Sequence, residues 1–213
     1  FSAFGKYNEA EKYLYKAIQI NKDYADAYFN LSLLQLHRGD YDLGLENYEF
    51  RFKKKNPAYL HGKPIIRRMD KEFLRPEEKV LIISEQGLGD TIQYMRYVPY
   101  MRSKNIDLSF CTLTKLHSII QVSNIDETPL SPDQGEKVQE GKWISLLSLP
   151  RLLRITPSNP IVFKPYILST SELKTKWKKK LKRETVSLSN RQMTQLRHVS
   201  RTQSQIKTLM RQS

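Results

Sequence analysis

The chain has 213 residues, enough for one or two domains, and its 36 Lys and Arg against 22 Asp and Glu give a formal net charge of +14. Its single cysteine, Cys111, excludes an internal disulfide and is typical of a reducing compartment, so we expect a cytoplasmic protein. No apolar run approaches the roughly 18–20 residues that cross a bilayer, and the histidines lack the spacing of metal ligands. Neither a membrane span nor a metal site is expected.

Residues 1–56 contain an internal repeat with a period of 34 residues. Gly5-Lys6-Tyr7 recurs as Gly39-Asp40-Tyr41, and the same shift places Ala10 on Gly44, so small residues occupy matching positions. Apolar side chains recur at helical spacing on both sides of the Gly-Asp turn. Repeats of this length are helix–turn–helix units that bury their apolar faces by stacking in arrays of about three or more. We therefore expect further repeats upstream of this sequence.

After the helices, the sequence predicts a linker, and beyond the linker the apolar residues no longer recur at helical spacing. A lysine run and Pro57 stop the helix, and residues 57–78 are predicted to be a linker. The short apolar run 79–84 is typical of a strand buried on both faces. A helix is expected from Thr91 until Pro99 kinks or ends it.

A second strand at 106–112 and a second helix at 113–122 complete a pattern of strand, Gly-rich loop, helix and strand. This order is typical of the start of an open α/β sheet. Residues 79–170 are therefore predicted to form an α/β lobe, and the predicted fold class is α + α/β.

The loop 85–90 between the first strand and its helix is the candidate ligand site. In open α/β sheets, ligands bind beyond the carboxyl ends of the strands. Gly87 and Gly89 let a ligand approach the backbone closely, and the following helix start favours anions. The loop is not a P-loop, because no Gly-Lys-Ser/Thr follows, and Ile92 stands where a dinucleotide fingerprint has its third glycine.

Polar side chains in and after this loop have both structural and functional interpretations. Asp90 could cap the helix together with Gln93, or act as a general base. Glu85 and Gln86 could hydrogen-bond a polar acceptor or simply be solvated. Arg96, further along the helix, could hold an anion or be a surface charge.

The sequence from Glu85 to Pro99, Glu-Gln-Gly-Leu-Gly-Asp-Thr-Ile-Gln-Tyr-Met-Arg-Tyr-Val-Pro, resembles a known family. It is similar to bacterial tetratricopeptide-repeat (TPR) proteins whose C-terminal part is glycosyltransferase-like and related to the ADP-heptose heptosyltransferases. The segments 48–52, 148–150 and 165–166 also resemble that family, and together the similarity covers about residues 1–178.

This resemblance implies a two-lobed, metal-independent glycosyltransferase of the GT-B type. The first lobe takes a glycan or protein acceptor, and the second binds a nucleotide-sugar donor, so no resident cofactor is implied. Asp90 matches the proposed base of the heptosyltransferases, and Gly87 and Gly89 match their loop glycines. Glu85, Gln86, Gln93 and Arg96 are the further substrate-binding candidates of this loop and helix.

Residues 171–213 depart from the family pattern. They hold 12 Lys and Arg against Glu172 and Glu184, a net charge of +10 that accounts for most of the charge of the chain. After Trp177 the family continues into its donor lobe, whereas this chain becomes basic and polar. We expect a disordered tail, and we hypothesise that it is the out-of-frame product of a frameshifted or truncated gene.

Three functions remain open from the sequence. The first is the acceptor half of a glycosyltransferase, inactive without its donor lobe. The second is a protein–protein interaction module in which the repeats bind a protein or peptide. Nucleic-acid binding by the tail is disfavoured, because residues 185–213 contain no aromatic residue on which bases could stack.

Overall fold

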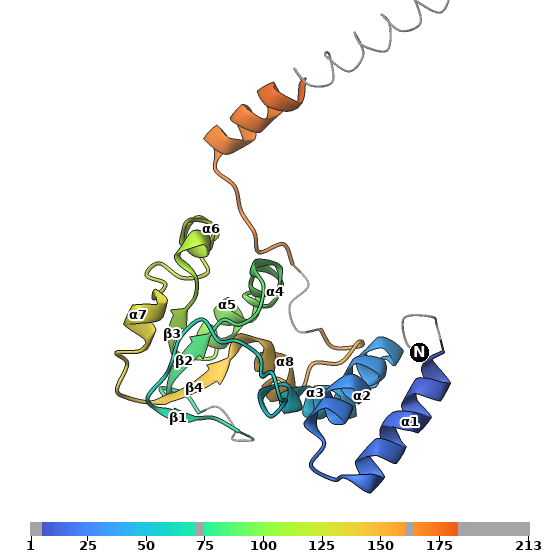
Figure 1. Ribbon diagram of the computed structural model, residues 1–213. Helices are drawn as coiled ribbons and strands as arrows, with labels where there is room; N and C mark the ends of the chain where they lie inside the picture. Colours follow the sequence, from blue (N-terminus) through green and yellow to red (C-terminus); the bar gives the residue numbers. More distant parts are fainter. Residues whose placement is uncertain (1–5, 71–74, 161–163, 183–213) are drawn as a thin grey trace, which may run out of the picture. The chain divides into compact units, whose positions relative to one another are not determined.

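The computed structural model describes residues 6–70, 75–160 and 164–182 (Figure 1). The chain divides into two compact units, residues 1–168 and 169–213. No helix in the described ranges is both long and apolar enough to cross a membrane. The first unit combines a helical segment with a small parallel sheet, so the coarse prediction of helices followed by an α/β region is confirmed.

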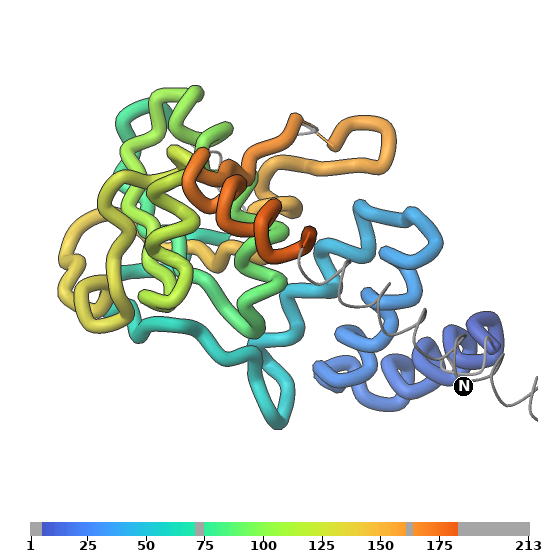
Figure 2. The backbone as a smooth tube through the Cα atoms, turned by 90° about the horizontal axis from the view of Figure 1, so that it is seen from above, coloured from blue at the N-terminus to red at the C-terminus, as the bar shows by residue number. Residues whose placement is uncertain are grey.

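The helical segment consists of three α-helices, which lie side by side (Figures 1 and 2), and a short 3₁₀ helix that follows the third and contacts the second. They are α1 (Tyr7–Ile20), α2 (Ala25–Arg38), α3 (Tyr41–Tyr48) and η2 (Glu49–Phe52). The first and third begin at Tyr7 and Tyr41, which occupy matching places in the two copies of the repeat motif. The sequence repeat is therefore also a repeat of helix starts.

Two glycines explain the repeat motif physically. Gly39 ends α2 with φ 85°, and its N–H and that of Asp40 bond back to the carbonyls of Leu36 and Gln35, the double closure of a Schellman cap. Asp40 then caps α3 by accepting the N–H of Leu43. A Cβ on Gly44 would lie 2.9 Å from the side chain of Leu36, so a small residue lets α3 approach α2 closely.

The sheet has four parallel strands in the order β1-β4-β2-β3. They are β1 (Arg67–Arg68), β2 (Lys79–Ile83), β3 (Asp107–Cys111) and β4 (Lys142–Ser145). Successive residues of β2 point to opposite faces, and both faces are buried: Val80 and Ile82 join the larger apolar core, and Leu81 and Ile83 join the smaller one. The continuous apolar run predicted at 79–84 thus has the burial expected of a strand covered on both sides.

Short helices follow the strands and cover the sheet (Figure 1). They are α4 (Leu88–Tyr94), α5 (Tyr97–Arg102), η3 (Thr114–Leu116), α6 (His117–Val122), α7 (Pro132–Gly135), η4 (Leu146–Ser148) and α8 (Leu149–Leu152). The larger core packs side chains of α4, α5, α6 and α8 on one face of the sheet. The smaller core packs Leu60, Leu130 and Val138 on the other face.

Two sequence predictions about boundaries are wrong. The predicted linker 57–78 contains strand β1 and the buried Met69, which is 1% exposed, because pairing with β4 gives this short polar stretch a place at the sheet edge. The helix after the loop begins at Leu88 rather than Thr91. The helix is interrupted at residues 95–96, between α4 and α5, which agrees with the predicted kink or end caused by Pro99; Pro99 itself lies in the first turn of α5.

The second unit is described only over 169–182, where residues 171–182 form a helix. The disorder predicted for 171–213 is therefore wrong for this stretch, whose lysines and leucines favour helix and whose sequence has no Gly or Pro. The remainder of the predicted tail, 183–213, lies outside the described residues.

Burial of Cys111 gives a direct test of this packing. The thiol is 0% exposed and donates weakly to the carbonyls of His61 and Ser131, and burial raises its pKa to about 11. At pH 8 we expect a thiol reagent such as DTNB to react at least roughly a hundredfold more slowly with the native chain than with the denatured chain. Because this is the only cysteine in the sequence, the signal is unambiguous, and rapid native labelling would contradict the packing of β3.

Candidate functional site

The carboxyl ends of β2 and β4 form the candidate site. The chain leaves β2 toward β3 on one side and later returns to β4 on the other, so the loops after these two neighbouring strands diverge. This is the topological switch point at which parallel sheets usually open a ligand crevice. Glu85 lies just after β2, while Ser145 ends β4 and Ser148 lies in the following turn.

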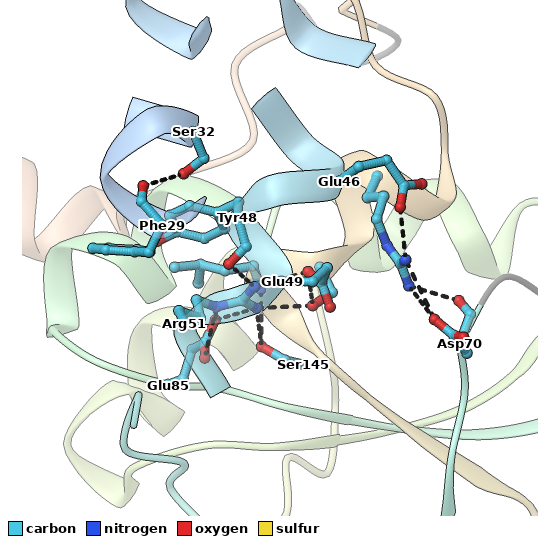
Figure 3. Close-up of polar contacts among 12 residues, drawn as sticks. Phe29, Ser32, Glu46, Tyr48, Glu49, Arg51, Asp70, Glu85 and Ser145 are labelled. Atoms are coloured by element: carbon cyan, nitrogen blue, oxygen red, sulfur yellow. Dashed lines mark hydrogen bonds and ion pairs between the residues drawn. The ribbon is translucent and has the colours of Figure 1, made fainter. Parts of the chain in front are cut away.

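In this structure the guanidinium of Arg51 occupies that position (Figure 3). Arg51 comes from η2 in the helical segment, and its side chain is only 1% exposed. Its Nε lies 3.0 Å from Glu85 Oε1 and its Nη2 lies 2.8 Å from the same oxygen. Nη2 also donates to Ser148 Oγ at 2.8 Å. The helical segment is thus bound directly to the ends of both strands.

A second carboxylate, Glu49, completes the neutralisation of Arg51. Arg51 Nη1 donates to Glu49 Oε1 at 2.8 Å, Ser148 Oγ donates to the same oxygen at 2.7 Å, and Arg68 bonds the other oxygen. Burial by itself would raise the pKa of Glu49, but the charge of Arg51 and these hydrogen bonds outweigh it and hold that pKa below its ordinary value. Burial likewise opposes the charge of Arg51, yet the two carboxylates raise its pKa.

Aromatic rings cover the guanidinium groups on their remaining faces. The Arg51 guanidinium carbon lies 4.1 Å from the centre of the Phe52 ring and 4.5 Å from that of Tyr48. Arg68 lies 4.2 Å from the same Phe52 ring. Around Arg51, these contacts exclude water, which strengthens its ion pairs and makes any uncompensated charge there costly.

Glu85 is therefore not a substrate-binding residue in this structure. Its side chain is fully buried, with an exposed fraction of 0%, and both carboxylate oxygens face Arg51. The sequence suggested a loop glutamate that is either solvated or free to bind an acceptor. Both interpretations are wrong, because the partner comes from a helix 34 residues earlier in the chain.

The next four residues, Gln86 to Gly89, form the exposed part of the loop. Gln86 adopts φ 59°, a left-handed conformation that turns the chain outward. Its backbone N–H bonds to Tyr59 O, and its side-chain amide donates to the hydroxyl of Tyr48 at 3.2 Å. A Cβ built on Gly89 meets no atom within 4 Å, so the surface beside this residue is open.

Asp90 lies within the first turn of α4 and is not the N-cap that the sequence suggested. Gly87 occupies the N-cap position, and the Asp90 carboxylate Oδ2 accepts its backbone N–H at 3.1 Å. This is the reciprocal half of a capping box, so the side chain of Asp90 points back toward the loop. Gln93, the predicted capping partner, is exposed in the next turn of the helix.

Arg96 is held within the protein rather than presented to a ligand. Its Nε donates to the carbonyl of Gln93 at 2.7 Å, and its Nη2 donates to the hydroxyl of Tyr166 at 3.2 Å. Its guanidinium also stacks 4.8 Å from the centre of the Tyr166 ring. Both proposed roles, anion binding and free surface charge, are replaced by a link between α4 and the segment after α8.

Two tyrosines near the loop keep their hydroxyl protons. Burial raises the pKa of Tyr94 to about 12, with smaller contributions from the charges of Tyr48 and Asp90 among others. Burial also raises the pKa of Tyr48, against the lowering effect of Arg51. Both phenols are therefore neutral hydrogen-bonding groups near neutral pH, and neither is an anionic base.

Within the described ranges no group of three or more His, Cys, Asp or Glu side chains could hold a metal ion. A separate surface depression of about 440 Å³, lined in part by Lys79, Asp107 and Glu140, lies at the amino ends of β2 and β3. It is at the opposite end of the strands from the loop and contributes nothing to the candidate site.

Comparisons of this chain with protein-family models, curated proteins and solved structures found no match. Sequence reasoning missed Arg51, Glu49, Ser145 and Ser148 as members of the site. A signal was present in Arg51, a charged residue set between two phenylalanines, but its partners lie far away in the sequence.

Removing one partner of the Arg51–Glu85 pair should strongly destabilise the first unit. Arg51→Met leaves Glu85 buried without a counter-charge, and we expect a loss of about 3–5 kcal/mol in the free energy of unfolding. Glu85→Gln leaves Arg51 paired with Glu49 and should cost less than Arg51→Met. Arg38→Met in the more exposed Arg38–Glu11 pair serves as the control and should cost less than about 1 kcal/mol. Denaturant titration measures both, and equal small losses would contradict a structural role for Arg51.

The buried His61 should make stability depend on pH. Its Nδ1 lies 2.8 Å from Ser84 Oγ, and burial lowers its pKa below the ordinary 6.5. The unfolded state then binds the proton more readily, so stability is complete above about pH 6.5 and decreases as the pH falls below it. Thermal melts at pH 7.5 and 5.5 should show a smaller decrease for His61→Gln than for the unchanged chain. An identical decrease would exclude His61 as the cause.

Proposed function

We propose that this chain is the acceptor-side part of an enzyme that transfers a sugar from a nucleotide-sugar to a glycan or protein acceptor. The observation that carries the proposal is the placement of the exposed loop 86–89 at the carboxyl end of β2, beside the partly exposed Asp90. The residue pattern of this loop and helix is the part of the sequence that resembles the heptosyltransferases. The geometry supports an acceptor site at this edge.

The chemistry assigned to Asp90 is that of a general base. One carboxylate oxygen is held by the N–H of Gly87, which fixes the direction of the side chain. The other oxygen would take the proton of an acceptor hydroxyl as that hydroxyl attacks the sugar. Gln86 and the open surface beside Gly89 would orient the acceptor, whereas Glu85 anchors the start of the loop through its ion pair with Arg51.

Departure of a nucleotide diphosphate requires groups that stabilise its developing negative charge. The cationic side chain at the ends of β2 and β4 is Arg51, and it is already neutralised by the buried Glu85 and the largely buried Glu49. We therefore propose that transfer requires a separate donor-binding lobe and that this chain does not turn over a nucleotide-sugar unaided.

Peptide or protein binding by the helical segment is the alternative function. Several large apolar side chains are exposed there, including Tyr15 at 45%, Ile20 at 87% and Leu33 at 47%. Exposed apolar surface on stacked helix pairs is typical of protein-binding arrays. Deleting residues 1–56 would not test this function cleanly, because the deletion also removes Arg51 from the sheet.

Two point variants separate the candidate functions. Gly89→Phe places a ring on the open surface beside the loop, where an added Cβ meets no atom within 4 Å, and Leu33→Ser removes an exposed side chain of α2. On a glycan array followed by calorimetry, we expect Gly89→Phe to weaken acceptor binding at least roughly tenfold and Leu33→Ser to leave it unchanged. Melting temperatures should match. If the chain binds members of a peptide library, and Leu33→Ser but not Gly89→Phe weakens that binding, the alternative function is favoured. If the chain binds no glycan on the array, the proposal is contradicted.

Asp90→Asn tests the catalytic assignment. The amide oxygen can still accept the Gly87 N–H, so acceptor binding and stability should be retained. With a donor-binding lobe supplied, the rate of sugar transfer should fall by roughly 10²–10⁴-fold. An unchanged rate would remove Asp90 from the mechanism.

A further inference from the structure

The helix over residues 171–182 carries one narrow apolar stripe. Leu173, Trp177 and Leu181 are spaced four residues apart, which places them on the same side of an α-helix. Their exposed fractions are 43%, 52% and 57%. An exposed tryptophan between two exposed leucines is unusual for a stretch that is otherwise strongly hydrophilic.

Lysines surround this stripe. Six of the twelve residues are lysine, and Glu172 is the single acidic residue of the helix. At helical spacing, Lys174 and Lys180 fall at the two borders of the stripe, and the ammonium of Lys180 lies 4.9 Å from the centre of the Trp177 ring. The remaining lysines cover the flanks and the opposite side. The helix therefore combines a small apolar face with a large cationic one.

This combination matches the surface of an anionic lipid membrane. Tryptophan places its ring at the boundary between headgroups and acyl chains, and bordering lysines extend their charged ends toward the phosphates while their methylene stems remain apolar. Six lysines among the twelve described residues make this segment too polar to cross a bilayer, so such a helix lies in the plane of the interface. Nucleic acid would use the lysines but not the apolar stripe.

We propose that the helix over residues 171–182 binds an anionic lipid surface, with Leu173, Trp177 and Leu181 inserted and the lysines contacting the headgroups. Charge complementarity selects this partner: a neutral bilayer would attract only the three-residue stripe. Each lysine near an anionic surface contributes roughly a fivefold increase in binding. This proposal is independent of the sugar-transfer function, since it rests on the second unit alone.

Vesicle co-sedimentation of the full chain tests the proposal. We expect binding to phosphatidylcholine vesicles that contain about one-third phosphatidylglycerol, and at least roughly tenfold weaker binding to pure phosphatidylcholine. Raising the salt concentration should weaken the anionic binding. Absence of binding to anionic vesicles at low salt would overturn the proposal.

A charge-matched pair of variants separates insertion from simple attraction. Trp177→Glu and Thr175→Glu change the net charge equally, but Thr175 lies on the side of the helix opposite the stripe. Trp177→Glu should weaken vesicle binding at least tenfold more than Thr175→Glu does. Circular dichroism checks that both variants keep their helix content.

The alternative occupants of the stripe give different results. Equal losses for the two glutamate variants would show attraction without insertion and would overturn the proposal. A mass above that of the monomer in light scattering, abolished by Trp177→Glu, would assign the stripe to a second copy of this chain. Tighter binding to single-stranded RNA than to anionic vesicles, unaffected by Trp177→Glu, would assign the helix to nucleic acid.

Discussion

The burial of one positive charge, the guanidinium of Arg51, constrains the rest of the first unit. An isolated buried charge costs several kcal/mol, so Arg51 can remain at 1% exposure only where Glu49, Glu85 and Ser148 all reach it. These groups come from the helical segment, the end of β2 and the turn after β4. The hydrogen bonds and ion pairs of Arg51 therefore hold the helical segment against the ends of both β2 and β4.

The same constraint decides what the sheet can offer to a ligand. The switch point between β2 and β4 would ordinarily be open, but here the Arg51 side chain and its carboxylates fill it. The surface left accessible is the outer edge, where the chain turns outward at Gln86 and the first turn of α4 begins. A substrate at this edge would meet backbone groups, the amide of Gln86 and the carboxylate of Asp90, rather than a deep cavity.

The two functions that we propose belong to different parts of the chain: the loop beside Asp90 and the helix over residues 171–182. The loop beside Asp90 is rigidly held, because Glu85 behind it is paired and the segment around Tyr59 bonds it from the side. The helix over 171–182 is instead amphipathic and cationic, and its properties follow from local sequence alone. The loop site exists only in the folded first unit, whereas the amphipathic surface of residues 171–182 requires only that this segment be helical.

Local pattern was enough for the features that depend on neighbouring residues. The repeat, the turn at Gly39, the apolar strand β2 and the strand β3 could all be predicted, since periodicity and backbone preference act over a few residues. The exact start of α4, the capping role of Asp90 and the strand within the predicted linker could not. Each depends on which backbone groups find partners after the chain has closed.

The sequence by itself determined that a helical repeat precedes an α/β region and that a Gly-rich loop follows the first buried strand. Only the tertiary structure decided that Glu85 is buried while Asp90 stays partly exposed beside the loop, because Arg51 approaches Glu85 from a distant helix. The two members of a buried ion pair can lie far apart in the sequence, so no local pattern predicts the pair. Leaving one member buried without its partner costs several kcal/mol. The folded structure, rather than the loop sequence, therefore decides which carboxylate of the loop remains accessible.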